Sequence, residues 1–331
     1  MPKNKFIPYP IEFEPIFKEK VWGGQNLKKL YSRNLPEAKK IGESWEISAL
    51  GNDVSKVAHG EYKGLLLTDL INKYTKSFLG ADIYNRFGSR FPLLYKIIDA
   101  HKPFSVQVHP DDIVAKTTEK GSWGKTELWY MLKTFSNTRI ITGIKDWVGD
   151  ETLINALQDG TIEQYLEESC VSDGDGYYIP AGRIHGLKGS AVFFEIQESS
   201  DLTYRLYDWD HNRELDIDKA IPVIEPNNSE EQLLSPVLIQ SDDFDERLLI
   251  ACDHFTVEKI TVTNKYSSLC NGEKFQVIFV TRGDGRLQYG KRCSEMIVLR
   301  EGGFYYLPAA LDQYKIVPDK HSIEFLKSFV T

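Results

Sequence analysis

Residues 174–187 read GDGYYIPAGRIHGL, and residues 302–315 read GGFYYLPAALDQYK. The shared centres of these two stretches, residues 177–181 and 305–309, differ at one position, and each follows a glycine-rich segment. In this alignment His185 of the first stretch corresponds to Gln313 of the second. An internal repeat of this kind predicts two related domains, of which only the first keeps the histidine.

The rest of the chain predicts a mainly β protein. Short segments rich in Tyr, Phe, Val and Ile alternate with Gly, Pro, Asn and Asp, as at residues 93–98, 104–109, 127–132, 192–197 and 276–280. Many short strands separated by turn residues indicate a sandwich or barrel. Helical spacing is confined to residues 66–79, 111–119 and 151–168, the last broken at Gly160. The polar segment 226–236, PNNSEEQLLSP, is predicted to link the two domains.

Composition excludes several classes of protein. The 331 residues are 41% hydrophobic and 27% charged, which is ordinary for a globular protein and excludes a disordered chain or a fibre. The net charge of -8 argues against binding to nucleic acid or to an anionic membrane. The chain has neither a run of 18 apolar residues nor an apolar segment near residue 1, so we expect no membrane span, no secretory signal and a cytoplasmic location. The four cysteines form no CxxC pair and are expected to be reduced.

Residues 104–111, FSVQVHPD, contain the first candidate donors. Alternation along a strand predicts Phe104, Val106 and Val108 on one face. The other face then carries Ser105, Gln107 and His109. Polar side chains at the core would be costly unless they bound a metal or ligand. The alternative is a half-exposed sheet whose polar face meets water.

Two more candidate donors follow along the chain. Glu127 begins an apolar strand, and His185 ends a PxGxxH pattern at residues 180–185. Each residue alone is as well explained by a structural role. Together with His109 and Gln107 they form a His₂Glu set with an additional amide oxygen, and zinc accepts such ligands at catalytic sites.

Arg205 is the candidate for binding an anion. It lies 20 residues after His185, and its simplest role is a surface ion pair with Asp201 or Asp208. The alternative is an anion clamp, since a guanidinium matches the geometry of a phosphate group. In that case Lys125, Lys102 and Ser105 would offset the acidic net charge locally.

These motifs resemble a known family. PxGxxH after a glycine-rich strand, with a metal-binding strand about 75 residues earlier, resembles a cupin barrel. More narrowly, the chain is similar over about residues 13–210 to the short, bacterial-type members of the type I mannose-6-phosphate isomerases. The matching segments are WGG at 22–24, GESWEIS at 42–48, FPLLYKIIDA at 91–100, QVHPD at 107–111, GKTELW at 124–129 and YIPAGRIHGL at 178–187.

The resemblance implies a fold and a domain division. The fold is two cupin (jelly-roll) β-barrels with a small helical segment. Residues 1–230 are expected to form the catalytic domain, with short helical insertions at about 66–79 and 111–168. Residues 237–331 are expected to form a second, metal-free domain.

The resemblance also implies a site and a reaction. One zinc ion per chain would be held by Gln107, His109, Glu127 and His185. The catalytic residues would be Arg205, Lys125 and Glu195, and the substrate-binding residues Ser105, Lys102 and Arg205. The reaction is the interconversion of mannose 6-phosphate and fructose 6-phosphate, with a proton moved between C1 and C2 through a cis-enediolate. Glu195, Lys125 and a metal-bound hydroxide remain open as the base.

Two alternatives stay open. The same ligand types bind iron, so the chain could be a cupin Fe(II) dioxygenase, or it could bind a phosphosugar without turnover. The expected partner is a small sugar phosphate, with no nucleic acid and no membrane, and the chain is expected to be a monomer or homodimer.

Overall fold

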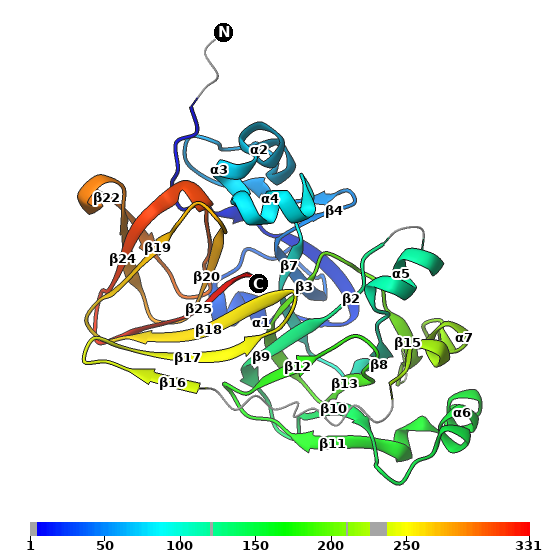
Figure 1. Ribbon diagram of the computed structural model, residues 1–331. Coiled ribbons are helices and arrows are strands. Elements are labelled where there is room, and N and C mark those ends of the chain that lie inside the picture. The colour runs from blue at the N-terminus through cyan, green and yellow to red at the C-terminus, as the bar shows by residue number, and fades with distance from the viewer. Residues whose placement is uncertain (1–4, 120–121, 210, 226–236) are drawn as a thin grey trace. The chain divides into compact units, whose positions relative to one another are not determined.

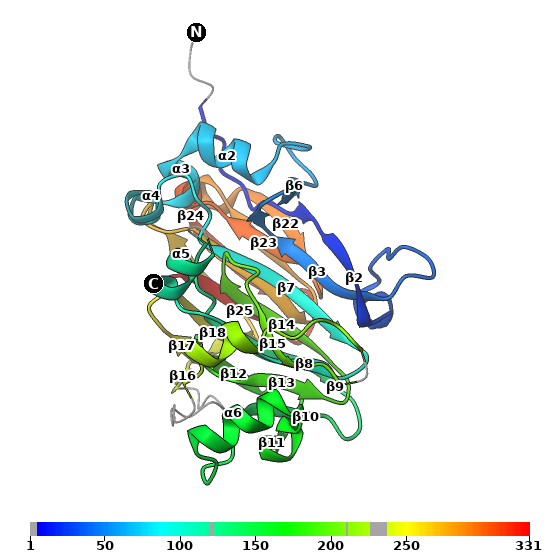
Figure 2. The ribbon, with the colours of Figure 1, turned by 90° about the vertical axis from the view of Figure 1, so that its right-hand side faces the viewer.

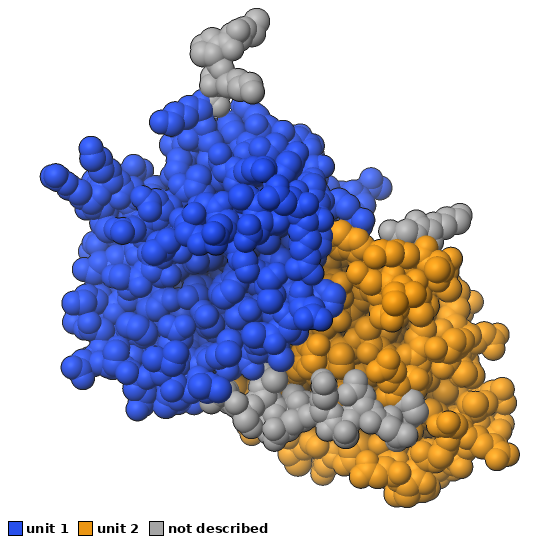
Figure 3. Space-filling model, viewed as in Figure 1, with its two compact units in different colours: residues 1–16, 46–92, 235–331 blue, residues 17–45, 93–234 orange. Residues whose placement is uncertain are grey.

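The computed structural model describes residues 5–119, 122–209, 211–225 and 237–331. These residues form two compact units, coloured separately in Figure 3. One unit comprises Phe17–Trp45 and Leu93–Leu234, and the other comprises Met1–Ile16, Glu46–Pro92 and Ser235–Thr331. Each unit contains one pair of β-sheets, called here the first and the second jelly roll in chain order.

The first jelly roll is built from two antiparallel sheets (Figures 1 and 2). The larger sheet has the order β12 (Gly176–Ile179), β9 (Glu127–Thr134), β14 (Ala191–Glu198), β7 (Leu93–Ala100), β3 (Ile41–Ile47) and β2 (Ile16–Gly24). The smaller sheet has the order β11 (Leu166–Cys170), β10 (Arg139–Ile144), β13 (His185–Lys188), β8 (Phe104–Val108) and β15 (Tyr204–Tyr207). Residues of β7, β8, β9, β10, β12, β13 and β14 share one apolar core cluster, so both sheets contribute to it.

The alternation predicted for residues 104–108 is wrong at one residue. Val106 and Val108 pack together in one core cluster, whereas Phe104 packs with Trp129 in another. The pairing of β8 with β13 runs from Gln107↔His185 to Phe104↔Leu187, so β8 uses one residue more than its partner. Such a bulge reverses the facing of the residues beyond it.

Short helices accompany the first jelly roll. They are α1 (Asn26–Tyr31), α5 (Asp112–Thr118), α6 (Asp150–Gln158), η1 (Ile162–Tyr165), α7 (Ile217–Ala220) and η2 (Ile221–Val223). The carboxylate of Asp111 caps α5 by accepting a hydrogen bond from the backbone N of Val114 at 2.8 Å. Leu153 and Leu157 of α6 pack in the same core cluster as Val106 and Val108, so α6 covers the outer face of the smaller sheet.

The second jelly roll repeats this strand order. Its larger sheet has the order β16 (Val237–Gln240), β17 (Phe244–Ala251), β18 (Phe255–Val262), β25 (Ile323–Val330), β20 (Gln276–Arg282) and β23 (Phe304–Leu307). Its smaller sheet has the order β19 (Tyr266–Cys270), β24 (Asp312–Pro318), β21 (Gly285–Tyr289) and β22 (Glu295–Leu299). The strands β7 to β14 thus correspond in order to β18 to β25, and β2 and β3 correspond to β16 and β17.

The remaining elements of this unit precede or join those strands. They are the pairs β1 (Phe13–Glu14) with β6 (Lys56–Val57) and β4 (Ala49–Leu50) with β5 (Asp53–Val54), the helices α2 (Leu67–Tyr74), α3 (Lys76–Leu79) and α4 (Ala81–Phe87), and the 3₁₀ turns η3 (Lys291–Cys293) and η4 (Ala309–Leu311). The helix predicted at 66–79 is therefore two helices, and Thr75 between them has a φ of 44°.

The prediction of a mainly β fold with two jelly rolls is confirmed, although the sheets face each other without closing into barrels. The repeated stretches supply β12 and β23, which are edge strands of corresponding sheets. The predicted linker, 226–236, lies outside the described residues. The division into functional domains at 1–230 and 237–331 stays a prediction, since the compact units group residues by packing. No described helix has the length and apolar character needed to span a membrane.

Candidate metal centre

Three sequence-predicted donors meet at the two sheets of the first jelly roll. His109 directly follows β8 and His185 begins β13, both in the smaller sheet, whereas Glu127 begins β9 in the larger sheet. The possible ligand atoms of the three side chains lie within 4.8 Å of one another, and all three residues are buried. We call them the metal triad.

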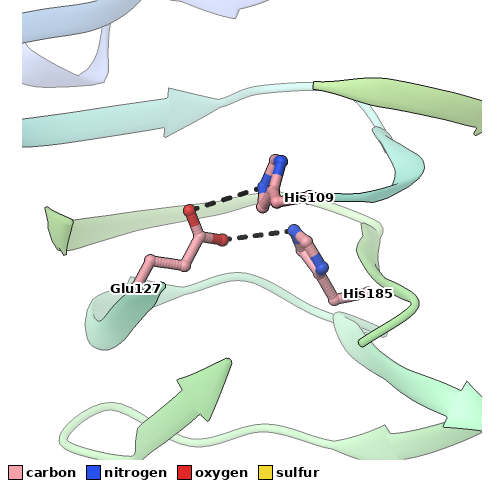
Figure 4. Close-up of side chains that lie close together, drawn as sticks. All are labelled: His109, Glu127 and His185. Atoms are coloured by element: carbon pink, nitrogen blue, oxygen red, sulfur yellow. Dashed lines mark ion pairs between the residues drawn. The ribbon is translucent and has the colours of Figure 1, made fainter. Parts of the chain in front are cut away.

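The carboxylate of Glu127 faces both imidazole rings, with one oxygen directed at each (Figure 4). Its Oε1 is 3.2 Å from His185 Nε2, and its Oε2 is 3.6 Å from His109 Nε2. The amide nitrogen of Gln107 lies 3.2 Å from His185 Nε2 and 3.5 Å from His109 Nε2. All four side chains that the sequence suggested as metal ligands are thus brought together.

The hydrogen bonds of the rings leave both Nε2 atoms as acceptors. His185 Nδ1 lies 2.9 Å from the carbonyl oxygen of Arg183, which can only accept, so this nitrogen carries the proton. His109 Nε2 lies 3.1 Å from the Lys125 amine, which can donate to it. Burial and the charge of Lys125 lower the pKa of His109 to about 3, which keeps its ring in the neutral form that binds metals.

Glu127 is ionised in this setting. Burial alone would raise its pKa, but Lys125 and the two histidines hold the pKa well below its ordinary value. Its Oε1 is buried without a hydrogen-bond donor among the described residues, and its Oε2 contacts the Lys125 amine at 2.6 Å. Buried polar atoms are normally paired, so Oε1 and the two Nε2 atoms that face the carboxylate fit a bound cation. Two imidazoles and one carboxylate form a donor set typical of catalytic zinc.

A cavity of about 220 Å³ adjoins the metal triad. Gln107 and Lys125, which contact the triad, are among its lining residues, and the Lys125 amine is 2.6 Å from Glu127 Oε2. Ser105, Glu195 and Arg205 also line it. A small polar molecule in this cavity would therefore reach the side chains around the metal triad.

Glu195 is held by two donors. Its Oε1 accepts a hydrogen bond from Lys96 at 2.9 Å, and its Oε2 accepts one from the indole nitrogen of Trp129, also at 2.9 Å. Lys96 lies opposite Glu195 in the pairing of β7 with β14 and donates a second hydrogen bond to Gln197. Burial would lower the pKa of Lys96, but the carboxylates of Glu195 and Glu43 raise it above its ordinary range.

Arg205 lies on β15 directly opposite Gln107 on β8. Its Nη1 donates to the carbonyl oxygen of Glu214 at 2.7 Å, and its Nε is 3.7 Å from Asp208 Oδ1. Lys102 differs from the other predicted site residues. It is exposed between β7 and β8 and is not among the residues that line the cavity.

Sequence analysis assigned no role to four charged residues of the cavity, Lys20, Glu43, Lys96 and Arg213. One signal was available for Lys96, because a lysine inside the apolar run 93–98 must be buried with a partner. Glu43 ion-pairs with Lys20 at 2.8 Å and accepts a hydrogen bond from the Trp45 indole at 2.7 Å. No local sequence pattern predicts these two contacts of Glu43. Lys20 lies on a different strand from Glu43, and Trp45 lies only two residues after it on the same strand.

The jelly-roll fold and the buried histidine–glutamate donor set define a cupin-type protein with a metal centre beside a polar cavity. A family model described as the catalytic domain of type I phosphomannose isomerase matches residues 11–129. The mannose-6-phosphate isomerase ManA of Bacillus subtilis is 34% identical, over 93% of this chain and 95% of that protein. A mannose-6-phosphate isomerase of Streptococcus mutans is 32% identical, over 92% of this chain and 96% of that protein.

A solved structure agrees with these relatives. The crystal structure of the mannose 6-phosphate isomerase from Bacillus subtilis superposes with a TM-score of 0.85, at 31% identity, over 96% of this chain and 99% of that one. This chain therefore belongs to the type I mannose-6-phosphate isomerase family.

Proposed function

We propose that the protein is a zinc-dependent isomerase that interconverts mannose 6-phosphate and fructose 6-phosphate. The observation that carries this proposal is the buried metal triad beside a cavity lined by cations, in a chain that belongs to this family. The cationic lining suits a phosphorylated sugar, although the protein as a whole has a net charge of -8.

We infer that His109, Glu127 and His185 hold the metal, with Gln107 as a fourth ligand. Zinc bound there would polarise the sugar carbonyl and stabilise negative charge on its oxygen. The carbonyl oxygen of Arg183 fixes the His185 ring so that Nε2 stays available, which is a common way to orient a metal-binding histidine.

Proton transfer between C2 and C1 needs one group that takes the proton and returns it. Lys125 is the better candidate, because its amine lies at the metal triad and lines the cavity. Both oxygens of Glu195 already accept hydrogen bonds from Lys96 and Trp129. We therefore assign the proton transfer to Lys125 Nζ, which must be uncharged when it takes the proton and carries that proton until it is returned to the sugar. Glu195 is assigned the positioning of Lys96. Arg205 and Ser105 are assigned contacts with the sugar phosphate.

We infer that the second jelly roll holds no metal. Its strand pairing places Leu269 and Gln276 where the first jelly roll has Gln107 and Glu127. The same alignment places Asn271 and Gln313 at the positions of His109 and His185. None of these four side chains is a preferred zinc ligand. Its proposed role is structural.

The test is a coupled assay of fructose 6-phosphate formation from mannose 6-phosphate, before chelation, after chelation and after zinc return. Loss with the chelator and recovery with zinc would support both the reaction and the metal. Oxygen consumption that requires iron would instead indicate a dioxygenase. Binding of mannose 6-phosphate without turnover by the zinc-loaded protein would indicate a phosphosugar-binding protein.

A further inference from the structure

The cavity beside the metal triad is lined by five cationic side chains: Lys20, Lys96, Lys125, Arg205 and Arg213. Each of the three lysines has a carboxylate of its own. Lys20 pairs with Glu43 at 2.8 Å, Lys96 with Glu195 at 2.9 Å, and Lys125 with Glu127 at 2.6 Å. The charges of the lysines are therefore already balanced within the protein.

The two arginines share the carboxylate of Asp208, and a second carboxylate, that of Asp216, lies near Arg205 and accepts a hydrogen bond from its backbone N at 3.1 Å. Arg213 Nε donates to both oxygens of this buried aspartate, at 3.0 and 3.1 Å, and Arg205 Nε lies 3.7 Å from Asp208 Oδ1. Asp201, another acidic lining residue, is exposed and forms no ion pair with either arginine. The guanidinium of Arg205 thus forms no hydrogen bond with a carboxylate of the described residues.

Two buried donors of the same cavity have no acceptor. Arg205 Nε and Trp22 Nε1 are buried and donate to no residue that the structure describes. Burial and the neighbouring charge of Arg213 also lower the pKa of Arg205. An anionic ligand would supply the missing acceptors and would form charge-assisted hydrogen bonds with the guanidinium.

The segment that carries Arg213 is fixed to the smaller sheet. The indole of Trp209 donates to the carbonyl oxygen of Phe104 at 2.9 Å, and His211 Nε2 lies 3.1 Å from the carbonyl oxygen of Pro103. The backbone N of Arg213 donates to Asp208 Oδ2 at 2.8 Å. The Arg213 side chain is thus positioned before any ligand arrives, which lowers the entropic cost of binding.

We propose that Arg213 is a specificity-determining residue that binds the phosphate group of the substrate together with Arg205. This inference rests on the proposed function and deepens it. A guanidinium matches phosphate oxygens and remains charged. Arg213 Nη1 forms no hydrogen bond with a described residue, so it can donate to a ligand while Nε and Nη2 stay on Asp208.

The test compares wild type, Arg213→Gln and Arg213→Lys. For Arg213→Gln we expect kcat/KM for mannose 6-phosphate to fall about 10- to 100-fold, mainly through KM, as for the loss of hydrogen bonds to a charged group. The inhibition constant of inorganic phosphate should rise with it, and Arg213→Lys should lie between the two. The matched control is Arg286→Gln, which removes an exposed arginine paired with Asp319 and should change neither constant.

A purely structural role is distinguished by turnover of free mannose. If Arg213 recognises phosphate, the preference for mannose 6-phosphate over mannose falls in Arg213→Gln, whereas a distorted site would slow both substrates equally. Unchanged KM and phosphate inhibition in the folded Arg213→Gln protein overturn the inference. If Arg213→Gln does not fold, the same two constants in Arg213→Lys decide, and wild-type values overturn it.

Failure of the proposed function gives a different result. In that case wild type itself does not turn over mannose 6-phosphate, and calorimetry with inorganic phosphate still compares wild type with Arg213→Gln. Weaker phosphate binding by the variant supports an anion site at Arg213, and equal binding by the two proteins refutes it.

Discussion

Lys327 occupies in the second jelly roll the strand position that Glu195 occupies in the first. Glu195 on β14 lies opposite Lys96 on β7, and Lys327 on β25 lies opposite Glu258 on β18, the strand that corresponds to β7. Both pairs are close, with N–O distances of 2.9 Å for Lys96–Glu195 and 2.6 Å for Lys327–Glu258. The two jelly rolls therefore keep the same cross-strand ion pair with its charges reversed.

The first prediction separates stability from catalysis at these two pairs. Lys96→Met leaves Glu195 buried without its ion-pair partner and should lower the free energy of unfolding by about 3 kcal/mol, whereas Lys327→Met leaves the partly buried Glu258 unpaired and should lower it by less. Only Lys96→Met should also lower kcat, because only Lys96 lines the cavity, where Glu195 positions it. Urea unfolding and steady-state kinetics measure both effects. Wild-type kcat in Lys96→Met would remove Lys96 from the site.

The second prediction concerns the metal triad. His185→Ala should lose zinc and activity together, because it leaves one histidine, one carboxylate and the weakly binding amide of Gln107 to hold the metal. Metal content after gel filtration, measured by atomic absorption, checks this. The control is His321→Ala, an exposed histidine in a turn, which should keep one zinc per chain. If His185→Ala retains its zinc, His185 is not a ligand.

The third prediction concerns Arg205. Arg205→Ala should lower kcat about 100- to 1,000-fold while zinc stays bound, because Arg205 lies opposite Gln107 and, besides its contact with the phosphate, would stabilise negative charge in the transition state. The nearby Arg213 should act mainly on KM. Kinetics and zinc content measured on the same preparation test this split, and full activity of Arg205→Ala would contradict the assignment.

The fourth prediction identifies the group that moves the proton. Lys125→Met should abolish exchange of the substrate C2 proton with solvent, because its amine lies beside the metal triad. Glu195→Gln keeps an acceptor for Lys96 and should retain measurable exchange. Proton NMR in D₂O reports the exchange directly. Loss of exchange in Glu195→Gln alone would reverse the two roles.

The fifth prediction is a pH dependence of stability. Burial alone would raise the pKa of Glu43, but Lys96, Lys20 and the hydrogen bonds from Lys20 and Trp45 lower it from 4.5 to about 2. A carboxyl group with a lowered pKa stabilises the folded state above its unfolded pKa, and this stabilisation is lost as the pH falls toward 2. The shift corresponds to roughly 3 kcal/mol.

Urea unfolding between pH 6 and pH 2.5 measures this effect. The free energy of unfolding should fall less steeply with decreasing pH in Glu43→Gln than in wild type. The exposed Glu37→Gln serves as the control and should follow wild type. Identical slopes for wild type and Glu43→Gln would show that the ion pairs of Glu43 do not stabilise the fold.

The site was predictable from sequence where local patterns carry the chemistry. Gln107 and His109 share one short segment, and the PxGxxH turn marks His185. The ion pairs of the cavity were not predictable in this way, because Lys96 and Glu195 are 99 residues apart and meet only through the pairing of β7 with β14. The facing of Phe104 was predicted wrongly, since regular alternation cannot anticipate the bulge in β8.

The fold was likewise predictable where it depends on local sequence and was not predictable where it depends on contacts between distant residues. A helix was expected over residues 111–119, and the structure has α5 there, capped by the side chain of Asp111. The helices α1 and α4 were not expected. The glycine at the start of α4, Gly80, has a φ of 105°, and an added Cβ would lie 2.1 Å from the carbonyl oxygen of Glu273. This constraint comes from a residue almost 200 positions away.

The repeated strand order gives the molecule an internal reference. Ten strands recur in the same order in the two jelly rolls, but the residues at the four donor positions differ. The second jelly roll can therefore accumulate changes, while the first must keep its metal-binding residues. Differences between the copies at positions outside the metal triad and the cavity lining are expected to reflect packing alone. A position-by-position comparison of the two jelly rolls thus separates the residues that the isomerase site requires from those that the jelly-roll fold requires.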